Sequence, residues 1–465
     1  MKPVVLISTY ALGHMPHGLA SPAAWLRREG FTVHTIDLAV EQLDESRVAE
    51  AGVIGLFVPM HTATRLALKV LQTIRQINPR VPVVFYGLYA PLNSELLKHQ
   101  GVQAAFGGEY EAALVDFCRR ANGRTAEEIA FESHISTERL AFPVPDRNGL
   151  PPLTQYATLL QEGHPPRAAG YVLTTRGCKH HCRHCPVVPV YRGRFRVVPR
   201  DVVLADIEQL VKLGATHLTF GDPDFLNGPG HVLPIVREMH ARYAHLTYDV
   251  TIKIEHLLRY AHLLPELKAT GCVLITTAVE SVDDAVLAIL AKGHTRADFY
   301  RAATLVRENG IALQPTFIPF HPWTTIESYL DLLYSIAELG LVVAVPPVQL
   351  AIRLLLPPGS LLLERPEIRP FITGFDPQRL SYLWENPNPQ VEDLYREVMA
   401  LISQRSSCQS QRLPIFREVW EMANRRASRP RPLPDPLPLP EEMPPYLSEN
   451  WYCCAEPTES QFEQV

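Results

Sequence analysis

Short apolar runs alternate with amphipathic stretches along the first part of the chain. The apolar runs have strand length, and the stretches between them repeat their apolar positions every three or four residues. Such alternation predicts right-handed βαβ units and a parallel, doubly wound sheet. We therefore expect an α/β, flavodoxin-like domain over residues 1–120, with strands at 4–8, 31–36, 52–58, 81–87 and 102–108.

A second alternating series begins near residue 170. Six repeats of strand and helix are typical of an incomplete (β/α)6 barrel, whose reacting groups lie on loops at the carboxyl ends of the strands. We expect this partial barrel over residues 169–360, with strands at 170–178, 216–220, 246–252, 272–278, 312–318 and 342–352.

Three other segments differ from these domains in composition. Residues 121–168 lose the periodicity and are rich in proline, glycine and charge, which predicts a linker. Residues 361–428 form a predicted helical extension. From Pro430 to Pro440 every second residue is proline, a pattern that favours extended polyproline II. We therefore expect a proline-rich arm over residues 429–465.

Composition and charge narrow the class of protein. A chain of 465 residues with 46% hydrophobic residues can bury more than one core. The net charge of -5 is spread along the chain, which argues against a nucleic-acid or membrane partner. No secretory signal or membrane-length apolar run is evident, so we expect a cytoplasmic protein. The eight cysteines concentrate in one triplet and one adjacent pair, favouring metal or redox chemistry over disulfides.

The triplet follows directly after a predicted strand. Cys178, Cys182 and Cys185 have the spacing CxxxCxxC, and three thiolates on one loop can ligate three irons of a [4Fe-4S] cluster. S-adenosylmethionine (SAM) can chelate the fourth iron and accept an electron into its sulfonium group. A Cys3His zinc site is the alternative, because histidines are interleaved with the cysteines at positions 180, 181 and 184. Zinc ligands usually form two separated pairs, however.

At this point the chain resembles the radical SAM superfamily, whose cluster motif has this spacing and follows the first barrel strand. The resemblance implies that the cluster cleaves SAM to a 5′-deoxyadenosyl radical. The family usually carries an aromatic residue before the third cysteine, against the SAM adenine. His184 occupies that position here, and its imidazole can still stack.

The same resemblance implies further SAM contacts. Gly221 and Asp222 stand where the family often carries Gly-Gly-Glu for the SAM amino group, although Asp222 could instead only shape a turn. Glu280 and Ser281 resemble the ribose-binding strand end. Lys292 could meet the SAM carboxylate or be a solvated charge at a helix end.

Further side chains at predicted strand ends are candidates for the substrate pocket. Lys253 and Glu255 follow the third barrel strand and would line the cavity or pair with each other. His321 and Trp323 follow the fifth strand, and Arg353 lies near the sixth. None of these residues specifies a reaction.

The amino-terminal domain resembles the cobalamin-binding class of the superfamily, on segments 54–87 and 106–117. The loop after its first strand lacks the DxHxxG motif that supplies a lower cobalt ligand, and neither His14 nor His17 fits that spacing. Two alternatives follow. The domain binds cobalamin without a protein histidine, or it only covers the barrel or binds substrate.

The tail carries the adjacent cysteine pair. Residues 451–457, WYCCAEP, resemble the end of a radical SAM group named for its CUAEP or CCAEP tail. Adjacent thiols can form a strained disulfide, bind a soft metal or accept a transferred group. We expect the arm to carry Cys453 and Cys454 to the barrel mouth as a redox or substrate-carrying device. The alternative is a terminus with incidental cysteines.

These patterns together predict a radical SAM enzyme with an unassigned small-molecule or peptide substrate, in which methyl transfer from cobalamin could follow radical formation. Its partner would be an electron donor such as flavodoxin or ferredoxin, with no nucleic acid and no membrane. The alternative is a non-catalytic iron-sulfur and cobalamin redox sensor. Thiolation of RNA ranks last, because no basic accessory domain is visible.

Overall fold

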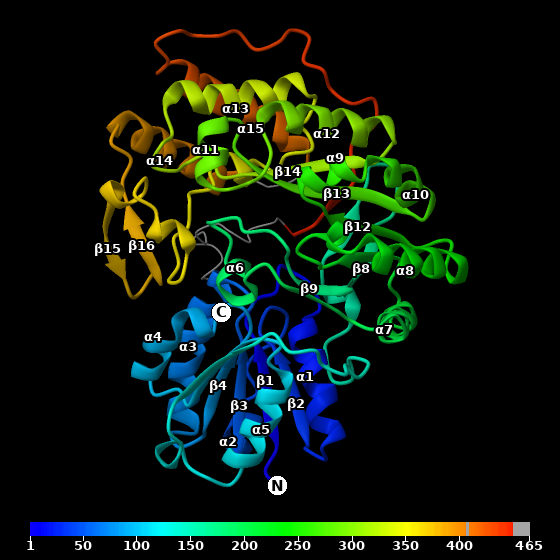
Figure 1. The fold of residues 1–465 in the computed structure, drawn as a ribbon, viewed down its shortest axis with the longest axis vertical. Coiled ribbons are helices and arrows are strands. Elements are labelled where there is room, and N and C mark those ends of the chain that lie inside the picture. Colours follow the sequence, from blue (N-terminus) through cyan, green and yellow to red (C-terminus); the bar gives the residue numbers. More distant parts are fainter. Residues whose placement is uncertain (406–408, 450–465) are drawn as a thin grey trace.

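The structure is a computed structural model that describes residues 1–405 and 409–449. Two α/β domains follow one another along the chain and pack together (Figure 1). The first contains a parallel sheet in the order β2-β1-β3-β4-β5-β6, whose first five strands have the flavodoxin arrangement. The strands are β1 (Val4–Ser8), β2 (Val33–Asp37), β3 (Val53–Phe57), β4 (Val83–Tyr86), β5 (Ala104–Gly108) and β6 (Glu132–Ser136).

Helices cover both faces of this sheet. Strands β1, β4 and β5 are buried along their whole length, which explains their continuous apolar runs. One face packs against α1 (His17–Arg28) and α5 (Glu111–Ala121). The other face packs against α2 (Glu45–Glu50), α3 (His61–Ile77) and α4 (Ser94–His99). The predicted flavodoxin-like domain is confirmed.

The second sheet curls into a partial barrel with the order β14-β13-β12-β11-β8-β7-β17. Its five central strands are parallel, and β7 and β17 add antiparallel pairs at one edge. The strands are β7 (Thr158–Leu160), β8 (Arg167–Val172), β11 (His217–Phe220), β12 (Thr247–Thr251), β13 (Cys272–Glu280), β14 (Ala312–Phe317) and β17 (Tyr446–Leu447).

The helices of this domain lie between successive strands, as the alternating pattern predicts. They are α7 (Arg200–Lys212), α8 (Pro229–Arg242), α9 (Ile254–Arg259), α10 (Leu264–Ala269), α11 (Asp284–Ile289), α12 (Arg296–Glu308) and α13 (Ile326–Glu338). The predicted partial barrel is confirmed in its class.

The sixth predicted strand, 342–352, is wrong. This segment instead forms turns and the short 3-10 helix η6 (Pro347–Leu350), and its remaining sheet-like contact is a bridge between Phe320 and Arg353. Pro346 and Pro347 remove two successive backbone donors, and proline is excluded from central strands for that reason. The segment is nevertheless buried, so its apolar pattern reflects burial and not strand pairing.

The segment predicted as a linker contributes to both sheets. Within 121–168, β6 pairs with β5 of the first sheet and β7 pairs with β8 of the second. The extension beyond the barrel contains the hairpin β15 (Ile372–Asp376) and β16 (Ser381–Trp384), and then α14 (Pro389–Gln404) and α15 (Arg412–Asn424).

The described part of the proline-rich arm lies against the barrel. Leu433 and Leu437 pack on the barrel core, and Arg431 forms an ion pair of 2.6 Å with Asp331 of α13. Figure 1 shows the arm passing over the outer side of α13 before it descends toward the middle of the molecule. Among the described residues, none of the helices has both the length and the apolar character that a bilayer span requires.

A buried ion pair joins residues 121–168 to the barrel, and its removal is expected to destabilise the protein. Arg147 donates to both carboxylate oxygens of Asp206 on α7, at 2.7 and 2.8 Å, and both side chains are 2% exposed. Arg147→Ala leaves the carboxylate buried and unpaired, which costs about 3–5 kcal/mol. Urea unfolding measures the loss. Lys212→Ala breaks an exposed pair with Glu208 and serves as the control, with an expected change under about 1 kcal/mol. Equal losses in both variants would contradict this account.

Candidate functional site

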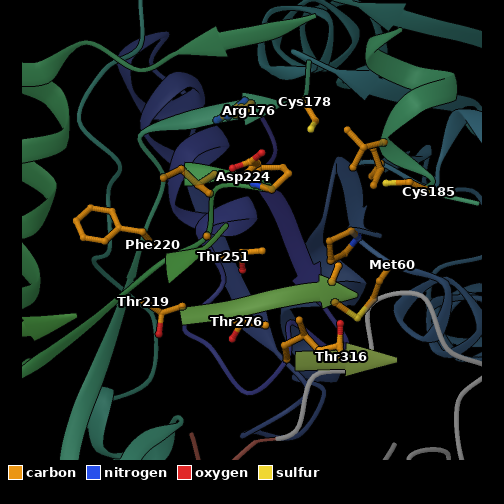
Figure 2. A pocket seen from close by; sticks show the side chains of 18 of the residues that line it. Met60, Arg176, Cys178, Cys185, Thr219, Phe220, Asp224, Thr251, Thr276 and Thr316 are labelled. Carbon is orange, nitrogen blue, oxygen red and sulfur yellow. The ribbon is translucent and has the colours of Figure 1, made fainter. Parts of the chain in front are cut away.

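A cavity of about 380 Å³ lies where the carboxyl ends of both sheets meet. The first domain contributes Leu12, His14, Met60, Gly87 and Gly108, all at or beyond the ends of its strands. The barrel contributes the cysteine loop and polar side chains of four neighbouring strands (Figure 2). Both domains therefore face one space.

The three predicted cluster cysteines all line this cavity. They follow β9 (Thr175–Gly177), which pairs with β10 (Phe195–Val197), and the loop ends in α6 (Val187–Tyr191). Gly177 has a φ of +76°, and a Cβ there would lie 2.5 Å from the Arg194 carbonyl oxygen, so the tight turn before Cys178 needs glycine. Three cysteine side chains on one loop, with no fourth cysteine among the cavity's described lining residues, fit a cluster that keeps one iron open.

A second polar group lies beside Cys178. His180 Nε2 and His256 Nδ1 lie 3.1 and 2.7 Å from Asp224 Oδ2, and Lys253 Nζ lies 3.1 Å from His180 Nδ1. Burial alone would raise the pKa of Asp224, but the two imidazoles outweigh it and lower that pKa. Asp224 and His180 are thus engaged with each other.

The donor atoms of Cys178, His180 and Asp224 lie within 4.8 Å of one another and could hold a single metal ion. This set differs from the Cys3His set of the zinc alternative, because the structure directs His184 away to Glu280. Among the described residues, the donor set that comes together is therefore one cysteine, one histidine and one carboxylate, and not three cysteines with a histidine.

Three predicted SAM contacts meet in one buried group. Glu280 Oε1 accepts from Lys292 Nζ at 3.2 Å and lies 3.1 Å from His184 Nε2, and all three side chains are at least nine-tenths buried. Lys292 is therefore not a solvated charge at a helix end. Glu280 has a φ of +69° at the end of β13, where the pairing with β14 shifts register, and this turns its carboxylate into the cavity.

The opposite charges in this group stabilise each other and shift the pKa values of its members. Burial on its own would raise the pKa of Glu280, but the Lys292 ammonium and the His184 imidazole lower the pKa to about 2. Burial would likewise lower the pKa of Lys292, but Glu280 and the neighbouring cysteines raise it. An anion and a cation are therefore both held in the cavity wall, where they can bind a zwitterionic ligand.

Asp222 and Ser281 do not line the cavity. Asp222 accepts from the Thr174 backbone nitrogen at 3.1 Å, from the Thr174 hydroxyl at 2.6 Å and from the Thr175 hydroxyl, so it holds the strand before the cysteine loop. Ser281 Oγ accepts from the Asp283 backbone nitrogen at 3.0 Å at the start of α11. Gly221 does line the cavity, and a Cβ there would lie 2.0 Å from the Tyr171 ring.

One cavity carboxylate that the sequence prediction missed is Asp224. It lies two residues beyond Asp222 in the same loop and faces the cavity in place of Asp222 (Figure 2). The only sequence signal for it is a second aspartate in FGDPDF, which does not say which of the two points inward.

Three further pocket candidates are engaged elsewhere. Arg353 donates to both carboxylate oxygens of Glu392, at 2.9 and 3.1 Å, and Trp323 Nε1 donates to the Glu367 carbonyl. Neither they nor His321 lines the cavity. Lys253 does line it, whereas Glu255 does not, and Lys253 Nζ donates to Glu255 at 3.3 Å, so the two residues pair with each other and Lys253 alone of the two faces the cavity.

The barrel floor carries polar side chains that the sequence prediction did not single out. Successive strands place polar groups on the face toward the cavity, and Figure 2 shows several of them pointing into the same space. They are Thr219, Asp249, Thr251, Thr276, Gln314 and Thr316. Polar residues at alternate positions of four strands are their signal in the sequence. A substrate with hydroxyl or amide groups would find partners here.

Two glycines line the first domain's side of the cavity, and a Cβ at either would lie within 3 Å of a backbone oxygen of the same domain. Gly87 and Gly108 follow the ends of β4 and β5 with φ values of +117° and +70°, and both line the cavity. His14 lies there too, stacked on Tyr171 with 4.8 Å between ring centroids, and burial lowers its pKa to about 4. The glycine edge fits cobalamin, and a neutral His14 is held by stacking.

A buried arginine joins the two domains below the cysteine loop. Arg176 on β9 donates to Glu111 of α5 at 2.6 and 2.9 Å, and lies 3.5 Å from Glu109. The hydroxyl of Ser21 donates to Glu111 at 2.7 Å, and the hydroxyl of Tyr191 donates to Glu109 at 3.0 Å. These contacts fix the loop that carries Cys178 relative to the first domain. Cys453 and Cys454 lie outside the described residues.

Comparison with known families matches both domains. Residues 172–333 match the family model of the Radical SAM superfamily, and residues 3–117 match that of the B12 binding domain. Among curated proteins, a ribosomal protein uS12 methylthiotransferase RimO of Cereibacter sphaeroides is 28% identical over 36% of this chain. A tRNA-2-methylthio-N(6)-dimethylallyladenosine synthase of Methylococcus capsulatus is 27% identical over 38% of it. The chain spans 38% and 41% of the lengths of these two relatives.

Two solved structures share the fold over most of the chain. The radical SAM methyltransferase TsrM from Kitasatospora setae, with tryptophan substrate and a SAM analogue bound, has a TM-score of 0.62 and 17% identity. The match covers 86% of this chain and 89% of that one. OxsB, a cobalamin-dependent SAM radical enzyme with aqua-cobalamin and SAM bound, has a TM-score of 0.66 and 13% identity, covering 90% and 71%. The two-domain arrangement of this chain is thus shared with these two structures.

Removing one member of the Glu280–Lys292 pair is expected to destabilise the barrel. Glu280→Gln leaves a buried ammonium without its carboxylate, at a cost of about 3–5 kcal/mol. Glu280→Gln with Lys292→Met removes both charges and is expected to recover more than half of that loss. Urea unfolding measures each variant. A double variant no more stable than the single one would show that the two charges do not depend on each other.

Asp222 is expected to make stability depend on pH. Burial raises its pKa from 3.8 to about 6, although the Thr174 and Thr175 hydrogen bonds lower it in part. The folded state therefore holds this proton more tightly than the unfolded state. Stability should fall as pH rises from about 4 to about 6, by on the order of 3 kcal/mol, and then level off.

Asp222→Asn removes this titration. Urea unfolding at several pH values is expected to show that the difference in stability between the native protein and the variant changes across this window. A pH-independent difference would contradict the raised pKa.

Proposed function

Because the chain carries a radical SAM domain and a B12-binding domain, we propose that it is a cobalamin-dependent radical SAM methyltransferase. The observation that carries this proposal is the shared cavity. Cys178, Cys182 and Cys185 open into the same space as the glycine edge of the B12-binding domain. A group held by one domain can therefore meet a substrate activated by the other without leaving the cavity.

The chemistry divides between the bound groups and the chain's own residues. When bound, the cluster with SAM supplies a 5′-deoxyadenosyl radical, and cobalamin supplies a methyl carrier. The three cysteines would hold the cluster. Glu280 and Lys292 would bind the charged and hydroxyl groups of SAM, and His184 would stack against its adenine while keeping Glu280 in place.

The substrate would lie over the polar floor of the barrel. Thr219, Thr251, Thr276 and Thr316 offer hydroxyls that both donate and accept, and Asp249 offers a carboxylate. Asp249 is partly engaged, because Thr219 donates to it at 2.6 Å and His217 Nε2 lies 2.9 Å away. This lining favours a polar small molecule or a peptide. An external one-electron donor such as flavodoxin or ferredoxin would be the partner.

Product analysis tests the proposal. The protein is reconstituted anaerobically with iron, sulfide and cobalamin, reduced, and supplied with SAM. We expect 5′-deoxyadenosine from the radical reaction and at least one equivalent of S-adenosylhomocysteine per bound cobalamin, because methylation of cobalamin consumes SAM without a substrate. Protein reconstituted without cobalamin should form 5′-deoxyadenosine alone.

Matched variants assign the two products. Cys182→Ser should abolish 5′-deoxyadenosine, whereas Cys118→Ser, which alters a buried cysteine outside the cavity lining, should not. A protein with an intact cluster that forms no 5′-deoxyadenosine would refute radical chemistry. Formation of 5′-deoxyadenosine without S-adenosylhomocysteine, in the presence of bound cobalamin, would refute methyl transfer.

A further inference from the structure

The barrel floor carries a row of polar side chains that have no partner within the described chain. Thr251 is in register with Thr276, and Thr276 with Gln314, so the three residues lie side by side across β12, β13 and β14. All three line the cavity, and their side chains form no hydrogen bond with another described residue. Because buried polar groups are nearly always hydrogen-bonded, this row is suited to meet the polar groups of a ligand.

Asp249 lies deeper in the cavity than this row. It precedes Thr251 by two residues on β12, so both side chains are on the same face of the sheet. The Asp249 side chain is 6% exposed, and its Oδ1 accepts from Thr219 at 2.6 Å and lies 2.9 Å from His217 Nε2. Its Oδ2 has no hydrogen bond to a described residue and is not enclosed by protein, so it is open to the cavity.

A chain of hydrogen bonds assigns the ring proton of His217. Arg167 Nη1 donates to the Thr247 hydroxyl at 3.0 Å, and that hydroxyl lies 2.8 Å from His217 Nδ1. The assignment that uses the Thr247 proton has Thr247 accept from Arg167 and donate to Nδ1. The ring proton then lies on Nε2, and a neutral His217 donates it to Asp249. Asp249 therefore keeps its negative charge.

The basic side chains of the cavity are all engaged elsewhere. Arg176, Lys253 and Lys292 are the arginine and lysines among its described lining residues, and each has a carboxylate partner of its own. Asp249 favours a positive charge on His14, but burial lowers the pKa of His14 to about 4, so this imidazole is neutral near pH 7. Asp249 is thus a buried anion without a resident cation, and buried charges are stabilised by pairing.

The surroundings of Asp249 suit an ammonium group better than a metal ion. Both ring nitrogens of His217 are engaged, and the neighbouring hydroxyls and amide carry no charge. Among the described residues, the group of three donors that could hold a metal contains Asp224 and not Asp249. An ammonium group has three N–H donors and can bond a carboxylate oxygen and neutral hydroxyl oxygens together.

We propose that Asp249 binds an ammonium group of the substrate and that His217 is the residue that positions this carboxylate. The substrate is then a small molecule or peptide with a primary amino group. The amino group lies at the deep end of the cavity, and the other polar groups meet the row of Thr251, Thr276 and Gln314 nearer the carboxyl ends of the strands. This inference rests on the function proposed above for the reaction, but the binding of the ammonium group requires no turnover.

Three probes that differ in charge test the proposal. They are 2-phenylethylammonium, 2-phenylethanol and phenylacetate, which share a phenyl ring and have nearly the same size. The full-length protein, reconstituted with cluster, cobalamin and SAM, is titrated with each probe by calorimetry at about pH 7, where an alkylamine is charged. We expect the ammonium to bind at least about tenfold more tightly than the alcohol, and the carboxylate to bind most weakly. Equal affinities, or a preference for the carboxylate, would overturn the proposal.

A matched pair of variants locates the cation. Asp249→Asn keeps an oxygen that accepts from His217 and Thr219 but removes the charge, so it is expected to abolish the preference for the ammonium over the alcohol. Glu308→Gln makes the same change in net charge at an exposed position at the end of α12, outside the cavity lining, and should keep the native preference. A preference that survives in Asp249→Asn would place the cation elsewhere and also overturn the proposal.

Two variants of His217 test its positioning role. His217→Gln retains an N–H donor near the place of Nε2 and should keep most of the preference for the ammonium. His217→Ala should lose this preference while it binds the alcohol as the native protein does. If His217→Ala weakened the binding of both probes equally, the role of His217 would be structural only.

Product analysis separates this inference from the proposed function. A protein that prefers the ammonium but forms no S-adenosylhomocysteine with cobalamin bound would refute methyl transfer and leave the Asp249 site in place. Formation of both SAM products without a preference for the ammonium would refute the Asp249 site alone.

Discussion

The arrangement of the site depends on one buried charge shared by the two domains. Arg176 is 6% exposed, and its partners Glu109 and Glu111 are 1% and 0% exposed. Burying three charged groups costs free energy of hydration, which is offset only when the groups are paired and hydrogen-bonded. This pairing requires β9 and α5 to be in contact. The two glutamates raise the pKa of Arg176 despite its burial, so the guanidinium stays charged. The cysteine loop begins two residues later, and its position relative to the B12-binding domain follows from this contact.

The same constraint operates inside the cavity. The Glu280 carboxylate lies between Lys292 and His184, so the buried carboxylate and ammonium offset each other's loss of hydration. The Asp224 carboxylate likewise lies between two imidazoles. Such groups do not adjust freely, because moving one member leaves another unpaired. The cavity therefore has preformed charge pairs in its wall and a floor of hydroxyl, amide and carboxylate side chains.

Much of the fold follows from local sequence patterns, and the cluster loop does too. Five strands of the first sheet and five strands of the barrel lie where apolar runs predict them, because parallel strands covered on both faces are continuously apolar. Strand β6, in the segment predicted as a linker, was not predicted. The same logic fails at 342–352, where two prolines prevent pairing in a segment that is still buried. Local patterns also do not show whether Asp222 or Asp224 faces the cavity, because two carboxylates in one loop differ only in the long-range contacts that each makes. The return of the arm to β7 depends on contacts across nearly 290 residues, which no local pattern contains.

The position of β17 also has a consequence for how the protein is made. Residues 446–449, of which Leu447 and Glu449 line the cavity, leave the ribosome after every other described part of the cavity wall. Until then the outer edge of β7 has no strand beside it, and an unpaired edge invites contact with other chains. Translation of the arm closes that edge and completes the cavity in one step.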